Sequence, residues 1–172
     1  MSWRLATAID QVGETETRAV AWQAGGATVA ALVTGGGASA ALTVLRARLS
    51  TRSEPPPAFA LTDALRLAME GAREGGGLTH AALVAVAAGR VAVALTGGVA
   101  AWIVADPPRP LGRGGEPGAH EVAAFAADLD GARRVMLITA PAGSAPTEPT
   151  GEPTAAALAI AARAAETAAT AR

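Results

Sequence analysis

The sequence predicts an α+β fold in which two antiparallel sheets pack face to face and are flanked by helices. Three observations lead to this prediction: a hairpin signal near the start, two helical patterns after it, and a group of strand patterns after the helices. The hairpin signal is Gly25-Gly26, which separates two apolar strand patterns at 18–23 and 27–33. The helical patterns cover 38–49 and 62–73, and the strand patterns cover 79–87, 90–96 and 99–104.

Each element in the first half of the chain has a local reason in the sequence. An apolar stretch at 5–9 predicts a first strand ahead of the hairpin. The first helix has three leucines on one side: Leu42, Leu45 and Leu49. Thr62 is expected to cap the second helix, and Gly75-Gly76-Gly77 to end it. Between the helices, Pro55-Pro56-Pro57 predicts a linker, because proline is not tolerated inside a helix.

The second half is predicted to hold further strands and one more helix. Gly97-Gly98 is interpreted as a hairpin turn, so that the three strand patterns from 79 to 104 form a meander. A stretch rich in proline and glycine at 106–119 predicts a loop. The remaining predicted elements are strands at 120–126 and 134–139, a loop at 140–153 and a helix at 155–171.

The composition limits the size, location and partners of the protein. A chain of 172 residues is most simply one domain, 1–172, and its hydrophobic fraction of 51% with only 3% aromatic residues predicts a core of small side chains. The formal net charge of −1 gives no electrostatic basis for binding nucleic acid or an anionic membrane. The absence of cysteine excludes disulfides, thiolate catalysis and cysteine–metal sites. With no signal peptide or membrane span evident, we expect a cytoplasmic protein.

Several segments resemble the motifs of one enzyme family. Leu32-Val33-Thr34-Gly35-Gly36-Gly37, which precedes a helix, resembles a V-A-D-G-M-G-G segment, and Gly77-Leu78-Thr79-His80-Ala81 resembles a G-T-T-A strand start. The segments 93–104, 111–117 and 130–141 resemble its glycine-containing hairpin, its L-G loop and its L-L-L-C-S-D-G-L strand. On these motifs the chain resembles the metal-dependent serine/threonine protein phosphatases, the PPM or type 2C family, with the related bacterial sporulation and stress-response phosphatases. The resemblance covers roughly residues 5–171 and implies a PPM-like sandwich.

The chain departs from this family at the residues that would bind metal. The family's carboxylates hold two divalent cations, and hard ions such as Mg²⁺ and Mn²⁺ require oxygen ligands. Three of these aspartates correspond here to Thr34, Gly98 and Ala140. In the N-terminal motif Asp10 is retained, but the phosphate-binding arginine corresponds to Glu16. The full set of former-site positions is Asp10, Glu16, Ala21, Thr34, Gly35, Gly98 and Ala140.

The resemblance and its departures together imply a catalytically inactive pseudophosphatase. Such a domain acts as a regulatory or scaffolding module in bacterial signalling, with another protein, such as a kinase or phosphoprotein, as its partner. We expect no cofactor, no bound metal and no catalytic residues. One alternative is a metal-dependent phosphoprotein phosphatase with an atypical site that uses Asp10, Glu16 or His80. Another is an unrelated small binding module.

Other polar residues have both a functional and a structural interpretation, and the structural one is favoured. The turn Gly35-Gly36-Gly37 has the amides to cradle a phosphate, but it lacks the lysine of a P-loop and is typical of a tight strand–helix turn. His80 and His120 are candidate ligands or bases without a usefully spaced third group. Asp128 and Asp130 form a candidate carboxylate pair, and their place before an apolar strand is better explained by turn formation.

Overall fold

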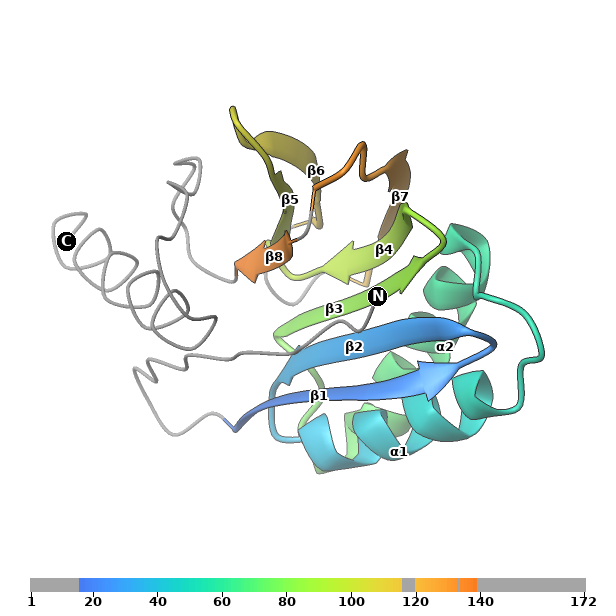
Figure 1. Cartoon of the computed structure of the whole chain (residues 1–172). Coiled ribbons are helices and arrows are strands. Elements are labelled where there is room, and N and C mark those ends of the chain that lie inside the picture. The colour runs from blue at the N-terminus through green and yellow to red at the C-terminus, as the bar shows by residue number, and fades with distance from the viewer. Residues whose placement is uncertain (1–15, 116–119, 133, 139–172) are drawn as a thin grey trace, which may run out of the picture.

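Two antiparallel sheets and two α-helices make up the described part of the chain, so the fold class is α+β (Figure 1). The structure is a computed structural model and describes residues 16–115, 120–132 and 134–138. The strands are β1 (Thr17–Ala24), β2 (Ala27–Thr34), β3 (His80–Ala87), β4 (Arg90–Thr96), β5 (Ala100–Val104), β6 (Arg109–Arg113), β7 (Ala123–Asp128) and β8 (Arg134–Ile138). The helices are α1 (Ala38–Ser50) and α2 (Ala58–Ala72), followed by a short 3₁₀ turn, η1 (Arg73–Gly75).

The larger sheet has five strands in the order β1-β2-β3-β4-β7, and the smaller sheet has three in the order β6-β5-β8. The predicted hairpin is confirmed: β1 and β2 pair from Thr17↔Thr34 to Ala24↔Ala27, with Gly25-Gly26 at the turn. Among the described residues, no helix has the length and apolar content needed to cross a membrane.

The second helix begins one turn earlier than the sequence predicted. Its N-cap is Pro57, in an extended conformation, and the amides of Ala60 and Leu61 donate to the Pro57 carbonyl. Thr62 is therefore not the cap, and its hydroxyl donates to the Ala58 carbonyl, one turn before it in the helix, at 3.1 Å. Proline is tolerated at this end of a helix because its missing amide removes no intrahelical hydrogen bond.

The predicted meander is wrong at its third strand. β3 pairs with β4, but β4 then pairs with β7, while β5 lies in the other sheet between β6 and β8. Gly97-Gly98 is therefore a crossing from one sheet to the other and not a hairpin turn. Both glycines have positive φ and both are buried, which distinguishes them from an exposed turn.

The remaining differences concern the loop and strands after residue 105. The predicted loop at 106–119 contains β6, an edge strand in which Pro110 is tolerated because one side of the strand needs no amide donor. The strand predicted at 120–126 is β7, shifted to Ala123–Asp128. β8 confirms the strand predicted from residue 134. The elements predicted at 5–9 and 155–171 and the loop at 140–153 lie outside the described residues.

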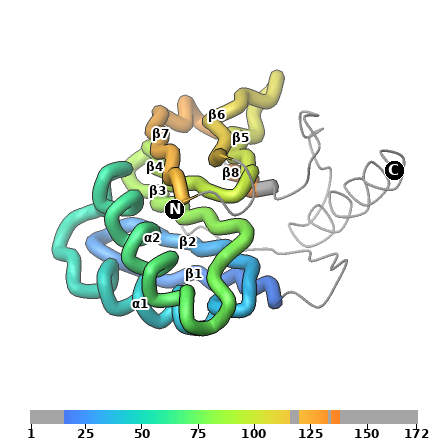
Figure 2. Tube along the Cα trace, turned by 180° about the vertical axis from the view of Figure 1, so that it is seen from behind, coloured from blue at the N-terminus to red at the C-terminus, as the bar shows by residue number. Residues whose placement is uncertain are grey.

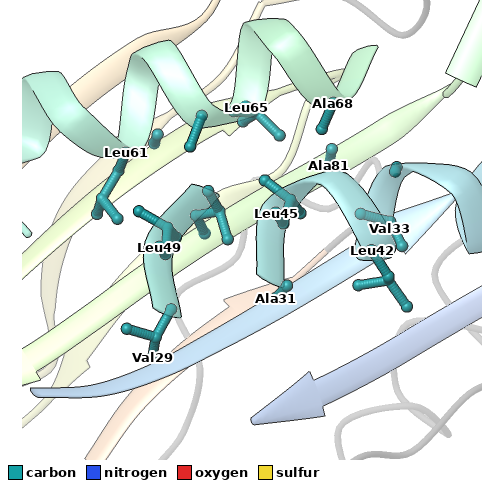
Figure 3. Packing of buried hydrophobic residues seen from close by; sticks show 14 of the residues in the cluster. Val29, Ala31, Val33, Leu42, Leu45, Leu49, Leu61, Leu65, Ala68 and Ala81 are labelled. Atoms are coloured by element: carbon teal, nitrogen blue, oxygen red, sulfur yellow. The ribbon is translucent and has the colours of Figure 1, made fainter. Parts of the chain in front are cut away.

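The helices cover one face of the five-stranded sheet (Figure 2). Val29, Ala31 and Val33 alternate along β2 toward this face, as expected for a strand with period two. Figure 3 shows them beside the leucines of the two helices, which belong to the same cluster: Leu42, Leu45, Leu49, Leu61 and Leu65. The leucine side of the first helix predicted from the sequence is thus confirmed as its buried side.

A second apolar cluster contains residues of both sheets. Val84 of β3 and Val91, Val93 and Leu95 of β4 belong to the same cluster as Ile103 of β5. The cluster between the helices and the five-stranded sheet is called here the helix-side cluster. Because successive Cβ atoms point to opposite faces of a strand, every second residue of β3 and β4 lies on the face toward the helix-side cluster. The residues between them lie on the face toward this second cluster. Both central strands are buried on both faces, which explains their nearly continuous apolar sequences.

The helix–sheet core gives a prediction with a matched control on one helix. Leu65 and Leu67 both lie in α2, but Leu65 is fully buried whereas Leu67 is 42% exposed. We expect Leu65→Ala to lower the free energy of unfolding by about 2–5 kcal/mol through lost burial and a residual cavity. Leu67→Ala should change it by about 0.5 kcal/mol. Urea unfolding followed by circular dichroism measures both, and equal losses would contradict this packing.

Candidate functional site

Two of the positions that correspond to metal aspartates in the resembled family, Thr34 and Gly98, lie where three strands of the larger sheet end or begin. β2 ends at Thr34, β3 begins at His80, and β4 ends at Thr96, just before Gly97. In the register of the sheet Thr34 is opposite His80, and Ala81 is opposite Thr96. We call this the glycine-rich end of the sheet, because the turns 35–37, 75–77 and 97–98 all lie there.

Thr34 is held by neighbours that are neutral. Its hydroxyl lies 3.0 Å from the hydroxyl of Thr17 on the adjacent strand. Its carbonyl accepts a hydrogen bond from the amide of Thr79 at 2.8 Å and a second from the hydroxyl of Thr79 at 3.2 Å. The position that would supply a metal carboxylate in the resembled family is therefore part of a hydrogen-bonded threonine cluster of Thr17, Thr34 and Thr79.

The turn after β2 interlocks with the turn before β3. The Gly35 amide donates to the Glu16 carbonyl at 2.9 Å, and the Gly37 amide donates to the Gly77 carbonyl at 3.0 Å. A Cβ on Gly35 would collide with the Gly77 carbonyl, and one on Gly36 with the Gly75 carbonyl. Two amides of the turn are thus already bonded to backbone oxygens, and close backbone packing accounts for the glycines. This supports the tight-turn interpretation over a phosphate cradle.

The crossing at Gly97-Gly98 is packed equally closely. A Cβ on Gly97 would collide with the carbonyl oxygen of Thr79. The Gly97 carbonyl is bonded to Nδ1 of His80, and since a carbonyl only accepts, the proton lies on Nδ1. His80 is half-buried and faces the same side of the sheet as Thr34. Its ring therefore fixes the crossing between the sheets, which accounts for a histidine at the start of β3.

Of the other former-site positions within the described residues, Glu16 and Ala21 contribute no side chain to this cluster. Glu16 precedes β1, and its carboxylate forms an ion pair with Arg18 at the surface. Ala21 is exposed in the middle of β1 opposite Ala30, four residues along the strand from Thr17 and so roughly 13 Å away. Asp10 and Ala140 lie outside the described residues.

The carboxylates of the candidate pair lie at the opposite end of β4. Asp128 is opposite Arg90 and forms an ion pair with it at 3.1 Å. Asp130, in the turn that follows, pairs with Arg109 at 2.9 Å. Within the described ranges there is no group of three histidine, cysteine, aspartate or glutamate residues that could hold a metal ion. His120 and Glu121 are exposed in the segment before β7.

Sequence reasoning singled out Thr34, Gly35 and Gly98 but missed their partners. The Thr34 hydroxyl bonds to Thr17, and the Thr34 carbonyl accepts from Thr79. One signal for this arrangement was present: the chain contains two triglycine runs, each at the junction of a strand pattern and a helix pattern. Two such junctions on adjacent strands bring their backbones together.

The glycine-rich end gives a prediction that separates backbone conformation from steric contact. Gly97 and Gly89 have similar φ values of 69° and 77°, but a Cβ on Gly89 would meet nothing within 4 Å. Gly89→Ala should therefore show only the conformational penalty of a left-handed alanine, about 1–2 kcal/mol. Gly97→Ala should be less stable by a further 1–3 kcal/mol or so, because the Thr79 backbone must shift. Thermal and urea unfolding of both variants test this, and equal stabilities would show that the contact is unimportant.

Comparison with known proteins finds no relative of this chain. No family model, curated protein or solved structure matches the chain. The resemblance to the metal-dependent phosphatases therefore rests on its sequence segments alone.

Proposed function

We propose that this chain is a protein-binding domain without phosphatase activity, built as a PPM-like sandwich. The observation that carries the proposal is the glycine-rich end of the sheet. There Thr34 and the Gly97-Gly98 crossing occupy positions that correspond to metal aspartates in the resembled family, and their polar groups bond to Thr17, Thr79 and His80. These partners are hydroxyls, amides and an imidazole that donates through Nδ1.

This set of groups is poorly suited to the two-metal reaction. The reaction requires hard oxygen ligands, mostly carboxylates, that bring two cations to a bridging water. The carboxylates of the candidate pair, Asp128 and Asp130, form ion pairs with Arg90 and Arg109 at the opposite end of β4. A protein that retained the scaffold would still present the surfaces of its helices and strands to a partner.

The outer side of α2 provides apolar surface for such a partner. Phe59 is 69% exposed and Leu67 is 42% exposed, and both lie in this one helix. We propose these two exposed side chains as contact points for a partner protein. As the partner we propose a kinase or a phosphoprotein of bacterial signalling, with the domain acting in the cytoplasm as a regulator or scaffold.

The first prediction from this function concerns metal and turnover. With Mn²⁺ in excess, the full chain should show no rise in melting temperature, because an ion that does not bind the folded state cannot stabilise it. A phosphoserine peptide should not be hydrolysed above background. An active phosphatase of the resembled family, assayed alongside, provides the positive control. Turnover that depends on Mn²⁺ and disappears with chelator would overturn the proposal in favour of a phosphatase with an atypical site.

The second prediction concerns the contact surface on α2. Phe59→Asp removes an exposed ring and adds a charge, so it should weaken recovery of a partner protein in affinity purification from the native source while leaving unfolding unchanged. Ala47→Ser, on the exposed side of α1, is the matched control and should leave recovery intact. If Phe59→Asp and wild type recover the same partner equally, α2 is not the contact surface.

A further inference from the structure

The first strand of the larger sheet has a neighbour on one side only within the described residues. β1 pairs with β2 and forms the edge of the five-stranded sheet (Figure 1). The Glu16 carbonyl accepts from the Gly35 amide, so the residues bonded to β2 are the even-numbered ones. The backbone groups directed away from β2 belong to Thr17, Ala19, Ala21 and Gln23.

This edge lacks the features that keep sheet edges from associating. β1 has eight residues in unbroken register, with no proline and no bulge, and its one charged residue, Arg18, is already paired with Glu16. The edge strand β6 is different: it contains Pro110 between charged residues, and its pairing with β5 shifts register between Ala101 and Trp102. Natural sheets guard exposed edges with charges, prolines and bulges, so an edge that lacks them is open to pairing with another strand.

We propose that β1 pairs antiparallel with β1 of a second copy of this chain, so that the two larger sheets become one continuous sheet. A row of alternating amides and carbonyls is satisfied by another strand, and an antiparallel edge is complementary to itself about a two-fold axis. The side chains at the outward-directed positions are small or uncharged: threonine, alanine, alanine and glutamine. A formal net charge of −1 adds little repulsion between copies. This proposal does not depend on the proposed function.

The two faces of the sheet restrict the register. If the helices of both copies lie on the same side of the joined sheet, each residue of β1 must be opposite a residue that points to the same face. Two registers satisfy this condition with the longest overlap of the strands: one centred on Val20 and one centred on Ala21. Centring on Val20 places Arg18 opposite the partner's Trp22, whose ring already has the Arg46 guanidinium 5.9 Å from its centre. Centring on Ala21 places Val20 opposite that Trp22, an aliphatic–aromatic pair without a second cation. We therefore assign the two-fold axis to Ala21.

Cysteine substitution tests both the pairing and its register, because the chain has no native cysteine. In the full chain, Ala21→Cys places two thiols opposite each other with Cα atoms about 5.5 Å apart, within the range that a disulfide spans. Gln23→Cys is the matched control, exposed on the same face of the same strand. In this register the two copies of residue 23 are displaced by four residues, roughly 14 Å along the strand. Mild oxidation should give a covalent dimer with Ala21→Cys and little with Gln23→Cys.

The association itself is measured by light scattering and sedimentation of the full chain. The mass should rise toward twice that of one chain as the concentration increases through the micromolar range. Ala21→Pro removes an outward amide at a position that proline tolerates, so it should stay monomeric with unchanged circular dichroism and melting temperature. The proposal is wrong if the wild type remains monomeric, if Ala21→Pro still dimerises, or if Ala21→Cys cross-links no faster than Gln23→Cys. A monomer with the Ala21 amide protected from hydrogen exchange would show that another segment of the same chain covers the edge.

Discussion

Backbone-to-backbone contact between two triglycine turns determines how the larger sheet and its helices fit together. The turn 35–37 leads from β2 into α1, and the turn 75–77 leads from α2 into β3. Their contact therefore fixes four elements at one point. The Gly37 amide and the Gly77 carbonyl bond across this contact, and a side chain on Gly35, Gly36 or Gly37 would strike backbone atoms of the opposite turn or of Ala72. The pairing of β2 with β3 then follows, with Thr34 opposite His80.

The core, like these turns, is built largely from residues with small side chains. Alanines fill many of the positions at which the helices meet each other and the sheet, among them Ala38, Ala41, Ala64, Ala68 and Ala72. Each buries little apolar area, so the larger contribution comes from the few leucines and valines, and from the dispersion contacts of a closely packed interior. None of the buried core residues that the structure describes is aromatic. Trp22 packs beside the helix-side cluster, and its buried indole nitrogen has no hydrogen-bond partner among the residues that the structure describes.

Local signals in the sequence predicted the parts of the fold that depend on neighbouring residues. The hairpin at Gly25-Gly26, both helices and the existence of most strands follow from periodicity and turn residues, which act over a few positions. The strands that pair with β5 and β7 could not be predicted in this way, because a Gly-Gly dipeptide is compatible both with a tight hairpin and with a crossing between sheets. What distinguishes Gly97 is the Thr79 backbone packed against it, a contact between residues far apart in sequence. The threonine cluster around Thr34 was missed for the same reason: it is made by strand register, and no single segment contains it.

The exchange of strands between the two sheets has a consequence for synthesis of the chain. Residues 17–96 contain four of the five strands of the larger sheet and both helices, and they leave the ribosome first. At that stage one face of β3 and β4, with Val84, Val93 and Leu95, has no second sheet to pack against. The fifth strand, β7, follows only after β5 and β6 of the other sheet. A nascent chain halted near Thr96 would thus expose an apolar sheet face to solvent, and transiently exposed surface of this kind promotes aggregation.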